Sequence, residues 1–156
     1  MKKDVKPFFV NVDLYDERIL FVLCSRKKFV KFARKNFNKK VRKGLIKMYD
    51  DGWKRNPTAL ALTSFTEGLP MMVSVKEMDT DNLTIANIQH EIFHCTSYIL
   101  RWKDISLTEE TEEAFAYLND YITSKVHFEI NQLIKKCWNK YIKENYVKKY
   151  EYDKDT

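Results

Sequence analysis

The chain of 156 residues contains few residues that interrupt regular structure, with only three glycines and three prolines. A flexible linker or a low-complexity segment needs many more of either residue. We therefore expect one domain over residues 1–146, followed by a charged tail over residues 147–156. The hydrophobic content of 44% is enough for a chain of this length to bury a core without disulfide bonds.

Cysteines are equally scarce, and the three present (Cys24, Cys95 and Cys137) are widely spaced, with no C-x-x-C pair. An odd, scattered set argues against a disulfide framework and favours a reducing compartment. The sequence also lacks an uninterrupted apolar run of the length that a signal peptide or a membrane span needs. We therefore expect a cytoplasmic protein, of the producing or host cell, with no membrane partner.

Four segments have the alternation and the β-forming residues that are typical of strands. Residues 8–15 and 18–24 flank a short polar break, and residues 59–65 and 71–76 flank a turn that contains Gly68 and Pro70. This pattern predicts two hairpin-like strand pairs.

Helical spacing of apolar residues occupies most of the remaining sequence. The first such segment follows Ser25. The second contains residues 90–100 and the residues before them, and the third follows the capping-box pattern of Ser106 and Glu109. A last lysine-rich helical stretch follows His127. The order predicts an α+β fold, in which an N-terminal antiparallel sheet packs against the helix of residues 90–100 and a following helical block.

Charge is unevenly distributed along the chain, whose net charge is +6. The segment Arg26–Lys47 holds eleven Lys and Arg residues and no Asp or Glu. Such a segment can bind phosphates or another anionic partner, or it can simply be the solvated face of a helix.

Two of the three histidines lie four residues apart, in His90-Glu91-Ile92-Phe93-His94. Residues at this spacing share one face of an α-helix, so both imidazoles can bind the same metal ion. Glu91 is rotated by about 100° and can reach a water molecule beside that ion. This H-E-x-x-H pattern is typical of zinc metallopeptidases, and it predicts one zinc ion with Glu91 as general base.

A catalytic zinc site needs three protein ligands and an open fourth position. The acidic segment Glu109-Glu110-Thr111-Glu112-Glu113 follows the motif helix after one short connection. Two antiparallel helices can bring a carboxylate from this segment to the histidines. We expect Glu113 to be the third ligand, because it borders the apolar face of its helix, with Glu110 as the alternative.

The motif together with Glu112-Glu113-Ala114-Phe115-Ala116-Tyr117 resembles the gluzincin branch of the zincin metallopeptidases, in which a Glu followed by Ala on a second helix completes the site. Residues 59–125 are also similar to small uncharacterised H-E-x-x-H proteins encoded by bacteriophages. The resemblance implies a zincin-like fold with zinc on His90, His94 and Glu113. Some gluzincins place an aspartate four residues after the ligand, where this chain has Tyr117.

In the expected reaction, a zinc-activated water attacks a peptide carbonyl, and Glu91 transfers the proton to the leaving amine. Tyr117 or His127 would help to stabilise the oxyanion. The strand before the motif helix would offer its free edge to an extended peptide or protein substrate. The residues of that strand are Met72, Val73, Ser74 and Val75.

Two other classes of function fit the same sequence. The first is a zinc-binding structural protein without catalytic activity. The second is a nucleic-acid-binding module that uses the segment Arg26–Lys47, and whose binding would not need the histidines.

Overall fold

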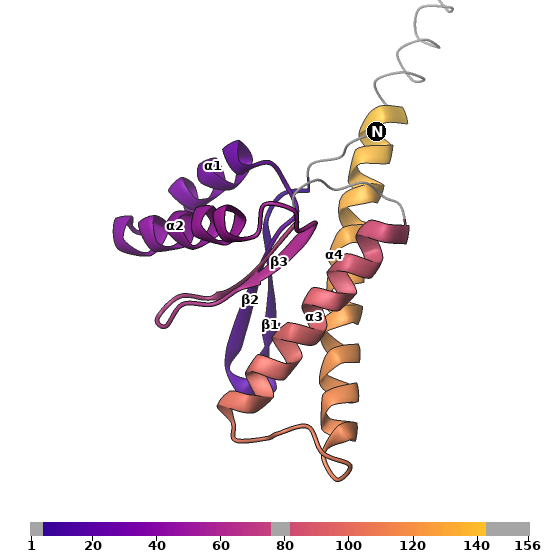
Figure 1. Ribbon diagram of the computed structural model, residues 1–156. Helices are drawn as coiled ribbons and strands as arrows, with labels where there is room; N and C mark the ends of the chain where they lie inside the picture. Colours follow the sequence, from indigo (N-terminus) through magenta and orange to yellow (C-terminus); the bar gives the residue numbers. More distant parts are fainter. Residues whose placement is uncertain (1–4, 76–81, 143–156) are drawn as a thin grey trace, which may run out of the picture.

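The computed structural model describes residues 5–75 and 82–142, without the side chains of 82–84, 133–134 and 136–142. The expected tail of 147–156 lies outside the described residues. The elements in chain order are β1 (Phe8–Val12), η1 (Asp13–Tyr15), β2 (Glu17–Val22), α1 (Arg26–Asn36), α2 (Lys39–Arg55), β3 (Ala61–Ser64), β4 (Met71–Val75), α3 (Asn82–Trp102) and α4 (Glu112–Ile142). The fold is a mixed α+β fold, as the sequence predicts (Figure 1).

The four strands form one sheet in the order β1-β2-β4-β3. Both predicted hairpins are confirmed, because β1 pairs with β2 and β3 pairs with β4 in antiparallel registers. The two hairpins meet where Phe21 of β2 lies opposite Val73 of β4, and this central pair of strands is parallel. The sheet is therefore mixed.

The expectation of an antiparallel sheet is wrong at this central pair. The chain leaves β2, forms α1 and α2 on one side of the sheet, and adds β3 at the far edge before it returns as β4. This long connection is what allows β4 to run parallel to β2.

The order of the strands also corrects the expected substrate edge. Residues Met72 to Val75 belong to β4, which is hydrogen-bonded to a strand on each side. An inner strand has no free backbone groups for a peptide to pair with. Among the described strands, the one at the free edge on this side of the sheet is β3.

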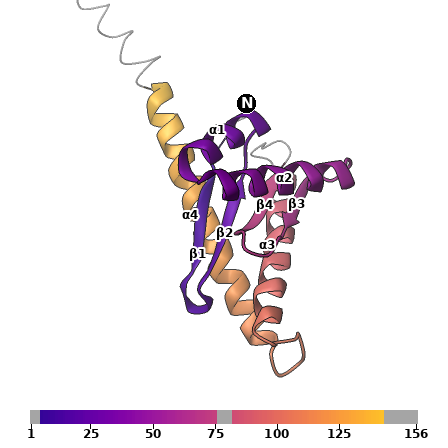
Figure 2. The same ribbon diagram turned by 90° about the vertical axis from the view of Figure 1, so that its left-hand side faces the viewer.

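The helices cover the two faces of the sheet. Helices α1 and α2 lie on one face and α3 and α4 lie on the other, as two perpendicular views show (Figures 1 and 2). Each face has its own buried cluster, with Phe29 and Leu45 of α1 and α2 in one and Ile92 and Ile122 of α3 and α4 in the other. The sheet is thus the middle layer of a three-layer domain.

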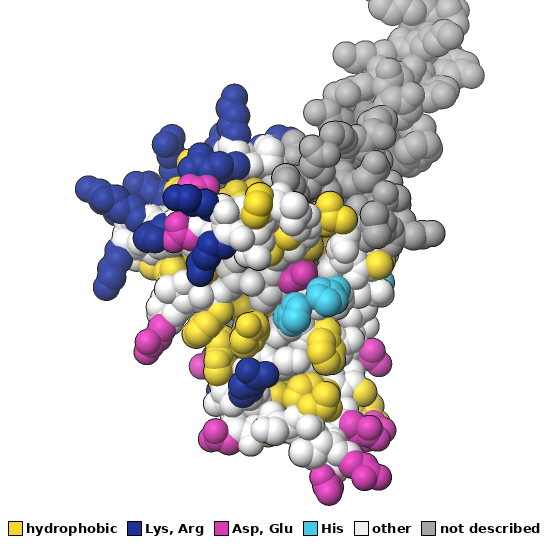
Figure 3. Space-filling model, viewed as in Figure 1, with side chains coloured by type: hydrophobic (Ala, Val, Ile, Leu, Met, Phe, Trp, Pro, Cys, Tyr) yellow, Lys and Arg dark blue, Asp and Glu magenta, His cyan; other side chains and the backbone are white. Residues whose placement is uncertain are grey.

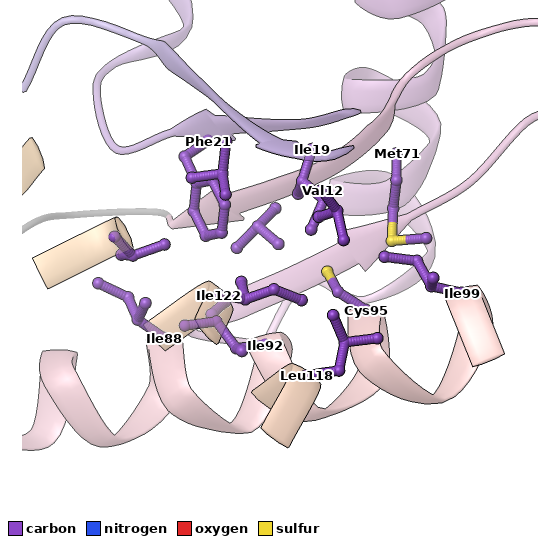
Figure 4. Packing of buried hydrophobic residues seen from close by; sticks show 14 of the residues in the cluster. Val12, Ile19, Phe21, Met71, Ile88, Ile92, Cys95, Ile99, Leu118 and Ile122 are labelled. Atoms are coloured by element: carbon purple, nitrogen blue, oxygen red, sulfur yellow. The ribbon is translucent and has the colours of Figure 1, made fainter. Parts of the chain in front are cut away.

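Helix α3 packs on the sheet through a stripe of apolar side chains at helical spacing. Figure 4 shows Ile88, Ile92, Cys95 and Ile99 pointing toward Ile19, Phe21 and Met71 of the strands and toward Leu118 and Ile122 of α4. All four stripe residues are at most 2% exposed. This packing fixes the rotation of α3 about its own axis.

Helix α4 begins later than the capping-box pattern predicts. Residues 108–111 form a turn instead, in which the hydroxyl of Thr111 accepts a hydrogen bond from the amide of Thr108 and donates one to the carbonyl of Ser106 (2.9 and 2.5 Å). The first helical residue is Glu112. The hydroxyl of Thr111 thus holds the turn before α4.

None of the helices in the described part of the chain combines the length and the apolar character that a membrane span requires.

The buried stripe of α4 supplies a test of this architecture. Ile122 is fully buried, so Ile122→Ala should lower the free energy of unfolding by about 2–5 kcal/mol through lost apolar contact and a residual cavity. The control Ser124→Ala changes an exposed position of the same helix and should stay within about 0.5 kcal/mol of the parent protein. Denaturant unfolding measures both values, and equal stabilities of the two variants would contradict the packing of α4 on the sheet.

Candidate metal centre on helix α3

His90 and His94 lie on the side of α3 that faces away from the sheet. The residue between them in the stripe, Ile92, is fully buried, and both histidines are exposed. Successive residues of an α-helix are rotated by about 100°, so the two positions that flank a buried Ile92 by two residues point outward. Figure 3 shows a pair of histidine side chains side by side on the surface over α3.

The two imidazoles converge on one another. Their Nε2 atoms lie 3.1 Å apart, and the rings are nearly perpendicular, with centroids at 4.7 Å. Two nitrogen ligands of a tetrahedral zinc ion, at Zn–N distances of 2.0–2.1 Å, lie about 3.3 Å apart. The pair therefore fits a zinc ion, although the same distance also fits a hydrogen bond in which one Nε2–H donates to the other ring.

Glu91 lies beside this pair but is buried, with 7% of its surface exposed. It shares a flank of α3 with Cys95 and Tyr98. Cys95 contacts Thr63 of β3, and Tyr98 contacts Phe65, the residue that follows β3. Among the side chains that the structure describes, no Lys or Arg forms an ion pair with the carboxylate of Glu91. A cation held by the histidines would lower the cost of burying this charge.

Thr63 of β3 ties the edge strand to the motif helix. Its hydroxyl donates a hydrogen bond to the backbone carbonyl of Glu91 (3.1 Å) and also contacts the thiol of Cys95. Burial raises the pKa of that thiol well above its ordinary value, so Cys95 is a neutral packing residue. The strand–helix contact sets the position of Glu91 relative to the free edge of the sheet.

An exposed aromatic cluster lies on the same flank of α3, beyond the motif. Phe65 follows β3, and its ring lies 4.5 Å from that of Trp102 and 6.5 Å from that of Tyr98. These side chains are 36–45% exposed. Sequence reasoning missed the cluster because Phe65 reaches α3 only through the tertiary fold, although Tyr98 and Trp102 have helical i, i+4 spacing.

The structure does not bring Glu113 or Glu110 to the histidines. Within the described parts of the chain, no group of three or more His, Cys, Asp or Glu side chains is placed to hold a metal ion. The reason is the length of α3, which continues for eight residues beyond His94, or about 12 Å along its axis, before the chain turns back. The first turn of α4 therefore lies near the C-terminal end of α3, away from the two histidines (Figure 1).

The acidic segment also has local partners of its own. The hydroxyl of Thr108 lowers the pKa of the Glu110 carboxyl through a hydrogen bond. Glu113 is exposed on the first turn of α4, where its charge interacts favourably with the helix dipole.

The two expected oxyanion stabilisers also lie away from the pair. Tyr117 lines a groove between α4 and η1, with Leu14 and Tyr121, and it is 72% exposed. His127 is exposed on α4 and joins no group of potential ligands among the described residues. Neither residue contributes to the centre as the structure describes it.

Comparisons with protein-family models, with curated proteins and with solved structures found no match.

The contact of Thr63 can be tested by removing its hydroxyl. Thr63→Val keeps the size and branching of the side chain but leaves the Glu91 carbonyl without this donor, so the free energy of unfolding should fall by about 1 kcal/mol. Thr66→Val, at an exposed turn position, is the control and should change stability by less than about 0.5 kcal/mol. A Thr63→Val protein as stable as the control would show that the hydrogen bond does not join β3 to α3.

Proposed function

We propose that this protein is a zinc-dependent peptidase with a zincin-like arrangement of its motif helix and edge strand. The observation that carries the proposal is the convergence of the Nε2 atoms of His90 and His94 at 3.1 Å, directly beside the buried Glu91. A conventional pair of surface histidines requires neither this convergence nor a buried carboxylate between them.

His90 and His94 would hold the zinc ion. When bound, zinc polarises a substrate carbonyl and makes water acidic enough to act as a nucleophile near neutral pH. Glu91 would accept the proton of that water and return it to the amine that leaves when the peptide bond breaks. Its place on the turn of α3 that also carries both histidines supports this role.

The free edge of β3 supports a peptide as substrate. An extended peptide can pair with a free strand through backbone hydrogen bonds, and Thr63 places this strand against the turn of α3 that carries Glu91. The exposed rings of Phe65, Tyr98 and Trp102 lie on the same flank and would contact an apolar side chain of that peptide.

Glu113 stays the predicted third ligand, with Glu110 as the alternative. For either carboxylate to bind the ion, the turn of residues 103–111 and the first turn of α4 must approach His94. The hydrogen bonds of Thr111 within this turn oppose that movement, and zinc binding would have to offset their loss.

Metal content tests the ligands directly. We expect the parent protein to bind one zinc ion and both His90→Ala and His94→Ala to lose it, whereas His127→Ala keeps it. Elemental analysis after dialysis against micromolar zinc measures the ratio of zinc to protein. Retention of stoichiometric zinc by both variants would contradict the site, and loss of zinc in Glu113→Ala but not Glu110→Ala would assign the third ligand.

Replacement of the proposed base separates catalysis from metal binding. Glu91→Gln should retain zinc but cleave peptides at least about 100-fold more slowly, since a positioned general base contributes about 10²–10⁴-fold. The matched control Glu112→Gln removes an exposed carboxylate and should cleave at the parental rate. Cleavage of a diverse peptide library, followed by mass spectrometry, gives the rates.

The second function that the sequence allows, a zinc-binding protein without catalysis, has less support, because a structural zinc site uses four protein ligands. Among the described residues, no further His, Cys, Asp or Glu side chain joins the histidine pair. Stoichiometric zinc binding by the parent protein, with no cleavage anywhere in the library, would select this function over the peptidase.

A further inference from the structure

A groove lined by lysines lies far from the motif in the fold, between the N-terminal segment and α1. It has a volume of about 380 Å³, and its charged lining residues are Lys6, Lys28, Lys31 and Lys35. Phe32 and Asn36 complete the wall on the side of α1. Among the residues that the structure describes, no Asp or Glu belongs to the lining, so the groove has a concentrated positive potential.

Both the helix and the N-terminal segment place these lysines together. Lys28, Lys31 and Lys35 have i, i+3, i+7 spacing and therefore share one face of α1. Phe29 and Ala33 are buried on the side of α1 that packs on the sheet, so the lysine face is exposed. The amide of Val5 donates a hydrogen bond to the carbonyl of Leu23 (3.1 Å), which holds the neighbouring Lys6 beside the start of α1.

The groove continues into a second hollow of about 600 Å³ over the β1–β2 edge of the sheet. The two share Lys6, Phe32 and Asn36, and the second adds Arg18 and the rings of Phe9 and Phe37. These rings are half-buried, and the guanidinium of Arg18 lies 4.2 Å above the ring of Phe9. Glu129 is the one carboxylate among the described residues of its lining.

The layer formed by α1 and α2 has a large positive net charge. Residues 26–55 contain thirteen Lys and Arg against two acids, Asp50 and Asp51. Both acids are engaged in ion pairs, with Arg26 and with Lys47. Figure 3 shows Lys and Arg side chains gathered over these two helices.

We propose that this lysine groove binds single-stranded nucleic acid. A row of lysine ammonium groups neutralises successive phosphates, and half-buried aromatic rings next to such a row offer contacts to unpaired bases. A concave groove with aromatic walls fits a flexible single strand, whose bases are free to turn toward the wall.

Two features disfavour an anionic membrane surface as the partner. The apolar faces of α1 and α2 are turned toward the sheet, with Phe29, Leu45 and Met48 buried, so neither helix has an apolar face to insert between lipids. The lysines also line a hollow, whereas a membrane presents a broad and flat surface.

Fluorescence anisotropy of labelled 20-nucleotide single-stranded DNA tests the proposal on the full chain. We expect saturable binding whose affinity falls steeply with salt. Lys31→Ala/Lys35→Ala removes two phosphate contacts, so the slope of log K against log salt should become smaller by about 1.4. Between 50 and 200 mM salt, the affinity of this variant should change about seven-fold less than that of the parent protein.

The control Lys43→Ala/Lys54→Ala removes the same charge from exposed positions outside the groove and should leave the slope nearly unchanged. Equal effects of the two double variants would overturn the groove as the site. Tighter binding to a duplex of the same length, or to vesicles with anionic lipid, would overturn the choice of partner. Binding by His90→Ala/His94→Ala should equal that of the parent, because the groove does not depend on the metal centre.

Discussion

The apolar stripe on α3 is the constraint on which the candidate centre depends. Ile88, Ile92, Cys95 and Ile99 pack against the sheet and α4, and this packing leaves one rotation of the helix about its axis. In that rotation His90 and His94 face outward, and Glu91 lies on the flank next to β3. A rotation that turned the opposite side of α3 toward the sheet would bury His90 and His94 among aliphatic side chains. The packing of the core thus selects the geometry of the motif.

Helix α3 and the edge strand together create three different environments within five residues. The imidazoles are exposed and converge, and the carboxylate of Glu91 is buried. The backbone carbonyl of Glu91 accepts a hydrogen bond from the hydroxyl of Thr63 in β3. A solvated metal ion could approach the histidines without any change of fold. The buried carboxylate could then interact strongly with it, because charges are screened less in a poorly hydrated environment than in water.

Local features of this molecule could be predicted from the sequence, and features that depend on distant segments could not. The i, i+4 histidines, the two hairpins and the helix after Ser25 follow from spacing within short windows. The parallel pairing of β2 with β4 could not be predicted, because it depends on which of two hairpins lies at the centre of the sheet. For the same reason, the sequence predicts an edge strand at residues 72–75, whereas these residues lie in the inner strand β4 and the edge strand beside it is β3.

The third ligand shows the same limit. Glu113 lies nineteen residues after His94 in the sequence (113 − 94), which is compatible with a helix, a turn and a second helix. Whether the two residues meet depends on how far α3 continues beyond His94, and it continues for two more turns to Trp102. A carboxylate level with the histidines would have to come from further along α4.

X-ray absorption at the zinc edge of the full chain, loaded with one equivalent of zinc, tests the central claim most directly. Our account predicts multiple-scattering features of two imidazole ligands, with the remaining ligands oxygen and with no sulfur. A spectrum with no imidazole scattering, or with thiolate sulfur in the first shell, would contradict it, because zinc would then be bound away from His90 and His94.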